Sequence, residues 1–168
     1  MAVSIERRSK SVLWRCSEIM AALLSLSCGG VIYLFFRPYN LLLFRVLDGM
    51  GCLSAVNQWR SMVPKAADMP EFLVYSLPNA LWVIAYLLIT DVVMHRRIAS
   101  EKMAWASLIP ATGTFAELLQ GIRLLSGTFD WADLLCYMLP WIAYMFMVRQ
   151  YDKQQNERTT NRQPLQQS

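Results

Sequence analysis

The sequence predicts an all-α integral membrane protein with four transmembrane helices and an interfacial or re-entrant helix between the first and the second. Of its 168 residues, 55% are apolar and only 17% are charged, whereas soluble domains carry about 25% charged residues. Several apolar runs approach the roughly 17–25 residues that a helix needs to cross a bilayer. The formal charge of +4 comes from Lys and Arg residues beside these runs, so it does not call for a nucleic acid partner.

We expect a single helical domain over residues 1–150. Its spans are predicted at about 19–36, 72–94, 103–122 and 133–148. The first span ends at Arg37-Pro38, because proline cannot continue the hydrogen-bond ladder of a helix. A cleaved signal peptide is the alternative to a retained first span, but no small-x-small cleavage site follows it. Pro78, Pro110 and Pro140 fall inside the other spans and predict local kinks or breaks.

Two segments do not read as spans. Residues 39–60 are interrupted by Arg45, Asp48 and two glycines. Their apolar residues recur at a spacing of three, so we expect a helix that lies in the interface, with a re-entrant segment as the alternative. The tail 151–168 is rich in Gln, Asn and Arg and has almost no apolar residues, so it is predicted to be disordered.

The distribution of basic residues predicts an orientation. With four spans, five of the 16 Lys and Arg residues fall on one side of the membrane (Arg37, Arg45, Arg60, Lys65 and Arg123), and the other eleven fall on the side of the termini. The excess of positive charge on cytoplasmic loops therefore places both termini in the cytoplasm. The turn between the last two spans and the segment 39–60 would then share the outer face.

The candidate site is a polar hairpin between the last two predicted spans. It contains Glu117, Gln120, Arg123, Asp130 and Asp133, with a turn at Ser126-Gly127. Charged groups are costly in hydrocarbon, so they need partners, a wet cavity or a function. One interpretation is a site for a lipid head group or a proton; another is an ion pair of Glu117 with Arg123 or Arg37. For Asp130 and Asp133, the structural alternative is an N-cap and an acid in the first helical turn.

The sequence argues against several kinds of chemistry. Carboxylates drawn together would suit acid/base catalysis or a divalent cation, but their spacing identifies no metal, and we predict neither a metal site nor a cofactor. No CxxC, phosphate-binding or H-E-x-x-H motif is present. The single histidine, His95, falls on the cytoplasmic side, where we expect a salt bridge with Asp91. A Ser/His or Cys/His nucleophile at the hairpin is therefore disfavoured, which argues against an enzyme.

At this hairpin the sequence resembles the VanZ-like family of small bacterial membrane proteins. The match is an acid and a glutamine three residues apart, followed by a Gly-Thr-x-Asp-x-x-Asp turn; the matching residues are Glu117, Gln120, Gly127, Thr128, Asp130 and Asp133. Residues 70–88 are also similar to an earlier span of that family, and Asn79 stands where some relatives carry an acid. The last span departs from the family pattern, because residues 135–138 lack the expected Asn-x-x-Gly.

The resemblance implies a multi-pass protein of the bacterial cytoplasmic membrane and the cell envelope. The family is linked to resistance to the glycopeptide antibiotic teicoplanin and to no established reaction. We expect the hairpin, with Arg37, Asn79 and Trp82 as contributors, to bind or handle a lipid or envelope precursor at the outer leaflet. The partners would be membrane lipids and another membrane protein.

The alternative function is that of a non-catalytic assembly subunit. Small residues of the first span, including Ser25 and Gly29, would let a partner helix approach closely. Aromatic residues near the span ends, such as Tyr33, Tyr39 and Tyr137, are interpreted as an interface belt. A transporter is disfavoured because no internal repeat or pair of broken helices is evident.

Overall fold

The structure is a computed structural model that describes residues 2–39, 42–63, 69–94 and 98–162. Over these residues the chain is helical, with short connections and no strand. The elements in chain order are α1 (Ala2–Phe36), α2 (Leu42–Gly49), α3 (Leu53–Arg60), the π-helical turn η2 (Phe72–Ser76), α4 (Leu77–Val93), α5 (Ala99–Gly121) and α6 (Trp131–Arg162).

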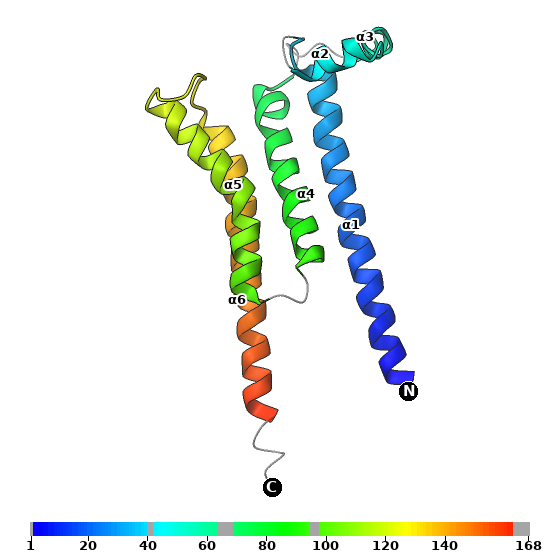
Figure 1. Cartoon of the computed structure of the whole chain (residues 1–168), viewed down its shortest axis with the longest axis vertical. Coiled ribbons are helices and arrows are strands. Elements are labelled where there is room, and N and C mark those ends of the chain that lie inside the picture. The colour runs from blue at the N-terminus through cyan, green and yellow to red at the C-terminus, as the bar shows by residue number, and fades with distance from the viewer. Residues whose placement is uncertain (1, 40–41, 64–68, 95–97, 163–168) are drawn as a thin grey trace.

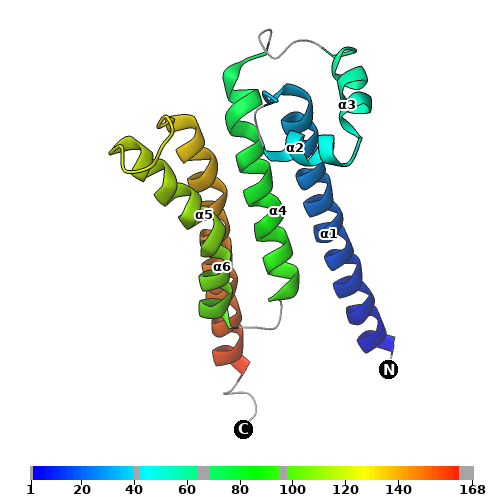
Figure 2. The ribbon, with the colours of Figure 1, turned by 45° about the horizontal axis from the view of Figure 1, so that its top comes forward.

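The long helices form a bundle in which α4 lies between α1 and the pair formed by α5 and α6 (Figure 1). Helix α1 begins and α6 ends at the same end of this bundle. The short helices α2 and α3 and the turn between α5 and α6 lie at the opposite end, which Figure 2 shows from another direction. The predicted grouping of the hairpin with the segment 39–60 at one end is therefore observed.

Three helices in the described part of the chain are long and apolar enough to cross a membrane. They are Leu13–Phe36, Phe72–Val93 and Trp131–Gln154. The described part of the chain is thus all-helical and has the hallmarks of a membrane protein, but α5, one of the four predicted spans, is not apolar enough to be counted with these three. This helix has 23 residues, about 34 Å at 1.5 Å per residue, yet Ser107, Thr112, Thr114, Glu117 and Gln120 lower its hydropathy.

The first turns of the second span contain the break that Pro78 predicts. Proline has no N–H, and its ring would clash with the carbonyl four residues earlier. The chain accommodates it with the wider turn η2, in which the Leu77 N–H donates to the Phe72 carbonyl five residues back. Helix α4 then continues without interruption to Val93, so the proline causes a π turn rather than a separation into two helices.

The segment 39–60 forms two short helices across the end of the bundle instead of one (Figure 1). Gly51 separates them because it adopts φ 71°, a left-handed conformation that favours glycine. The Gly51 and Cys52 N–H groups donate to the Asp48 and Leu47 carbonyls at 2.9 Å each, which closes the C-terminal end of α2. Phe44, 2% exposed, anchors α2 in the protein.

The small residues of α1 pack against α4 within the same chain. A Cβ atom at Gly29 would lie 2.6 Å from Trp82 Nε1, so only glycine permits this approach. The Ser25 hydroxyl donates to the Leu81 carbonyl at 2.9 Å. The predicted close helix approach is therefore present, but its partner is α4, and this face of α1 no longer argues for a separate partner protein.

The centre of the bundle is built by α4, α5 and α6. Val83, Leu87, Ala106 and Tyr144 form its buried cluster. Helix α6 starts at Trp131, two residues before the predicted span, and extends through Arg162. Residues 151–162 are helical, whereas the sequence predicts disorder there. The physical reason is that Gln, Lys, Glu and Arg are good helix formers and no Gly or Pro interrupts them. The remainder of the predicted tail, 163–168, lies outside the described residues.

Candidate functional site

The candidate site begins where α5 ends. The Arg123 N–H donates to the Gln120 carbonyl at 3.0 Å, and the Leu124 N–H donates to the Leu119 carbonyl at 2.9 Å. This is the hydrogen-bond pattern of a helix C-terminus closed by a left-handed residue. That residue is Arg123, with φ 62°, where glycine is usually found. The Arg123 side chain is exposed. The backbone at this position is strained, because a residue with a Cβ adopts the left-handed conformation that the hairpin requires.

Two close contacts shape the turn that follows. The Gln120 side chain lies against Gly127, where an added Cβ would be 2.7 Å from Gln120 Oε1. Gly127 has φ 145°, which also favours glycine. The Phe129 ring lies over Gly121 and meets the Trp131 ring edge-on, with 4.8 Å between centroids. These contacts return the chain to the start of α6 beside the end of α5.

Three of the predicted carboxylates come together at this point. Glu117 is only 7% exposed, and its Oε2 accepts a hydrogen bond of 3.4 Å from the Asp130 N–H. Both Asp133 and Asp130 are close enough to interact electrostatically with the Glu117 carboxyl. The Asp133 Oδ1 atom is buried and has no hydrogen-bond partner. We call Glu117, Asp130 and Asp133 the hairpin cluster.

Asp130 also has the structural role that its spacing predicts. Its Oδ1 accepts a hydrogen bond of 2.8 Å from the Ala132 N–H, and its carbonyl accepts one of 3.1 Å from the Leu134 N–H. This is the geometry of an N-cap. The structural alternative is therefore present at both positions, because Asp133 is the acid in the first turn of α6, where the helix dipole favours it. It leaves one observation over: the buried Asp133 Oδ1 has no hydrogen-bond partner.

The predicted ion pairs of the hairpin cluster are absent from the described structure. No Arg123 or Arg37 nitrogen lies within ion-pair distance of Glu117, Asp130 or Asp133 there. Among the residues described, no group of three or more His, Cys, Asp or Glu side chains is arranged to hold a metal ion. The cluster is thus a set of oxygen acceptors beside a buried helix face, suited to hydroxyl or ammonium donors.

Tyr137 belongs to this site, although its position near a span end suggested an interface aromatic. It lies one turn after Asp133 on α6, and it is near enough to Asp133, Glu117 and Arg37 to interact electrostatically with each. Its ring packs against Gly113, where an added Cβ would be 2.6 Å from the ring. The i, i+4 spacing of Asp133 and Tyr137 was the available signal, because it places both on one helix face.

The three predicted contributors lie on the α1 and α4 side of the bundle. Arg37 Nη2 donates to the Tyr75 carbonyl at 2.9 Å, and Asn79 Nδ2 reaches the same carbonyl at 3.4 Å. Trp82 packs against Tyr33, with 5.3 Å between ring centroids. Of the three, only Arg37 has a described electrostatic link to the hairpin side, through Tyr137.

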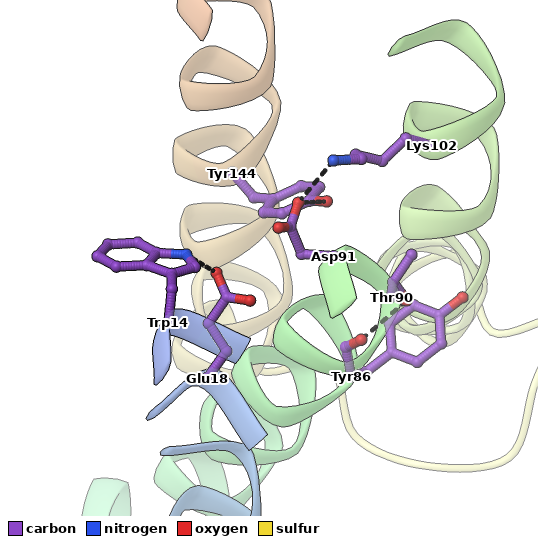
Figure 3. Close-up of polar contacts among 7 residues, drawn as sticks. All are labelled: Trp14, Glu18, Tyr86, Thr90, Asp91, Lys102 and Tyr144. Carbon is purple, nitrogen blue, oxygen red and sulfur yellow. Dashed lines mark hydrogen bonds and ion pairs between the residues drawn. The ribbon is translucent and has the colours of Figure 1, made fainter. Parts of the chain in front are cut away.

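A second polar group lies at the opposite end of the bundle (Figure 3). Asp91 Oδ1 accepts hydrogen bonds from Lys102 Nζ at 3.0 Å and from the Tyr144 hydroxyl at 2.9 Å. One carboxylate oxygen therefore joins α4, α5 and α6. The predicted partner of Asp91, His95, lies outside the described residues. Nearby on α4, Thr90 donates to the Tyr86 carbonyl within its own helix.

Comparisons with known proteins give no independent identification. No protein-family model, no curated protein and no solved structure matches this chain.

Proposed function

We propose that this chain is a membrane protein of the cell envelope whose hairpin cluster binds the polar head group of a lipid or envelope precursor at the outer leaflet. The observation that carries the proposal is the buried, unpaired Asp133 oxygen beside the buried Glu117 carboxyl. Buried polar atoms without partners are rare in native proteins and call for an explanation such as a bound donor. A hydroxyl-rich or ammonium-bearing head group supplies such donors.

The resemblance of the hairpin to the VanZ-like family supports the same proposal. It extends to a bacterial cytoplasmic membrane location and to the family's link with teicoplanin resistance. We further propose that α5 crosses the membrane as a fourth span, protected by its neighbours α4 and α6. Such a path agrees with a chain that begins and ends at the same end of the bundle (Figure 1), and the Lys and Arg distribution would place that end in the cytoplasm.

The test is mass spectrometry of the lipids that the purified protein retains, with wild type compared with a Glu117→Gln, Asp130→Asn double variant. Glutamine still accepts from the Asp130 N–H, and asparagine is as good an N-cap as aspartate. The double variant therefore keeps both structural contacts and removes two charges. We expect wild type to enrich a phospholipid or polyprenyl lipid, and the variant to lose about tenfold or more of it, since hydrogen bonds to charged groups contribute about 1.5–3 kcal/mol.

Asp48→Asn is the matched control. Asp48 is an exposed carboxylate in α2 at the same end of the bundle, outside the hairpin cluster. Its substitution should leave the retained lipids unchanged. If wild type and the double variant carry bulk lipid in the same proportions, the hairpin cluster is not a ligand site.

A non-catalytic assembly subunit is the second candidate. The feature that favours it is the apolar part of α1, Leu13–Phe36, because only 11% of the residues in its most apolar stretch are buried within the chain. A partner helix would have a long exposed face to pack against. Recovery of the protein in a defined complex, with bulk lipid only, would favour this function over lipid binding.

A further inference from the structure

An apolar groove runs along α1 on the side of α4 that faces away from the hairpin cluster. Its volume is about 410 Å³, and its lining consists of Leu26, Gly30, Tyr33, Leu43 and Trp82. Ligand sites in proteins commonly have volumes of roughly 300–1,000 Å³. Four of the five lining residues belong to the apolar spans of α1 and α4, and Leu43 comes from α2 at the end of the bundle.

The position of the groove favours a lipid chain over a water-soluble ligand. Residues of two helices that are apolar enough to cross a membrane line the groove, so in a membrane the hydrocarbon chains of the lipids would surround it. Gly30 contributes to the opening because it has no side chain, and an added Cβ there would meet no atom within 4 Å. An acyl chain fits such a groove without the loss of any protein hydrogen bond.

One end of the groove is positively charged. Tyr33 lines the groove, and the guanidinium carbon of Arg37, the first residue after α1, lies 5.3 Å from the centre of its ring. The same guanidinium lies 4.7 Å from the Tyr75 ring. Arg60 donates to the backbone carbonyl of Arg37 at 2.8 Å and to that of Leu34 at 3.0 Å, while its guanidinium stacks on the Tyr39 ring.

The two arginines differ in how many of their N–H groups have a hydrogen-bond acceptor. Arg60 closes the C-terminal end of α1 through its two carbonyl contacts, so its role is partly structural. Arg37 has one described acceptor, the Tyr75 carbonyl, and its Nε–H is buried with no acceptor. Within the described ranges, no Asp or Glu oxygen lies within ion-pair distance of either arginine. The positive charge of Arg37, which contacts the groove residue Tyr33, therefore has no anionic partner among the described residues.

We infer that this groove holds one anionic phospholipid, with an acyl chain along Gly30 and Trp82 and its phosphate at Arg37. Arginine suits this role because its planar guanidinium can donate two parallel hydrogen bonds to a phosphate. A net anionic lipid is favoured over a zwitterionic one, because the Arg37 guanidinium, which contacts the ring of the groove residue Tyr33, has no carboxylate within ion-pair distance among the described residues. The inference requires that the chain sits in a membrane, but it does not require that the hairpin cluster binds a ligand.

Trp82 reports on the groove directly. A variant that keeps Trp82 and has phenylalanine at the other five tryptophans would be titrated, in detergent micelles, with phospholipids carrying brominated acyl chains, which quench a contacting indole. We expect brominated phosphatidylglycerol to quench at a mole fraction at least about fivefold lower than brominated phosphatidylcholine, as a charge-assisted contact of about 1 kcal/mol gives. Arg37→Gln should remove this difference, and Arg37→Lys should retain part of it.

Gly30→Leu tests the chain-binding half of the inference. An added Cβ at Gly30 would meet no atom within 4 Å, so a leucine side chain can extend into the groove, and leucine also improves helix propensity. The fold should therefore be preserved. We expect quenching by both lipids to require about tenfold more lipid. Gly49→Leu is the matched control, because Gly49 also has open space around it but lies outside the groove.

Two results would overturn the inference. Equal quenching by the two lipids in the parent variant would mean that Trp82 senses only surrounding lipid. Gly30→Leu behaving like Gly49→Leu would mean that no chain occupies the groove. The Glu117→Gln, Asp130→Asn double variant should quench normally, so a failure of the hairpin proposal leaves this result intact and the two can be told apart.

Discussion

The bridge centred on Asp91 gives the sharpest stability prediction. Asp91 Oδ1 is shared by Lys102 Nζ at 3.0 Å and the Tyr144 hydroxyl at 2.9 Å (Figure 3). The side chains of Lys102 and Asp91 are 15% and 25% exposed, so the pair is largely but not fully removed from solvent. Asp91→Ala would leave an ammonium group and a hydroxyl without their acceptor, which costs more than the contact itself contributes.

The expected size follows from these contacts. Hydrogen bonds to charged groups contribute about 1.5–3 kcal/mol each in water-soluble proteins, whereas polar contacts between membrane helices average only about 0.6 kcal/mol, with a maximum of about 1.7. With two such contacts on one oxygen and partial exposure, we expect Asp91→Ala to lower the free energy of unfolding by about 2–3 kcal/mol. Asp91→Asn keeps an acceptor for Tyr144 and should cost about half as much.

The assay is unfolding of the purified protein by SDS in mixed micelles, followed by circular dichroism. A double-mutant cycle with Lys102→Met isolates the pair, and we expect a coupling free energy of about 1 kcal/mol. Asp152→Ala, which removes an exposed carboxylate of α6, is the control and should have little effect. A coupling near zero, or equal effects of the Asp91 and Asp152 substitutions, would refute the reasoning.

Three further predictions use the same protein. Gly113→Ala should lower the free energy of unfolding by about 1–3 kcal/mol in the SDS assay, because its Cβ would lie 2.6 Å from the Tyr137 ring; an unchanged midpoint would contradict this packing. Arg123→Gly should raise the free energy of unfolding by up to about 1 kcal/mol, since glycine adopts φ 62° without steric cost, and a loss of stability would show that the arginine side chain is needed. With the native cysteines replaced, single cysteines at the exposed positions Ser100 and Ser126 should be labelled from opposite sides of the membrane if α5 crosses it; labelling from one side would exclude the fourth span.

The helices were largely predictable because hydropathy and proline positions act locally. The apolar runs predict the positions of α1, α4 and α6, and Pro78 predicts the irregular turn that the structure shows as η2. The hairpin cluster was also predictable, because the residues of a tight turn between two helices must lie close together. The fourth predicted span is less apolar than the other three, since α5 carries polar residues whose cost in a membrane depends on neighbours that the sequence does not specify.

The partners of polar side chains were harder to predict than their positions. Asp91 finds Lys102 and Tyr144 on two other helices, and no local spacing could reveal which faces of α5 and α6 turn toward it. The position of Tyr137 near a span end indicates an interface aromatic. Its contact with Gly113 of α5, across the bundle, leaves no local signal in the sequence. The end of α5 was predicted to within about one residue, because the predicted span 103–122 and the helix Ala99–Gly121 close at the same place. The left-handed residue that closes the helix was not predicted, because Arg123 stands where glycine is usual.

The two polar groups of the bundle differ in how fully their oxygens are used, and this difference separates a structural role from a binding role. Asp91 Oδ1 accepts hydrogen bonds from two donors on two other helices, so these contacts account for its burial without a ligand. Asp133 Oδ1 is buried and has no donor, and the nearby Glu117 accepts a single long hydrogen bond of 3.4 Å. Asp133 lies in the first turn of α6, where the helix dipole favours an acid, but an unpaired buried acceptor is costly. The proposed head group would supply the donor that this oxygen lacks.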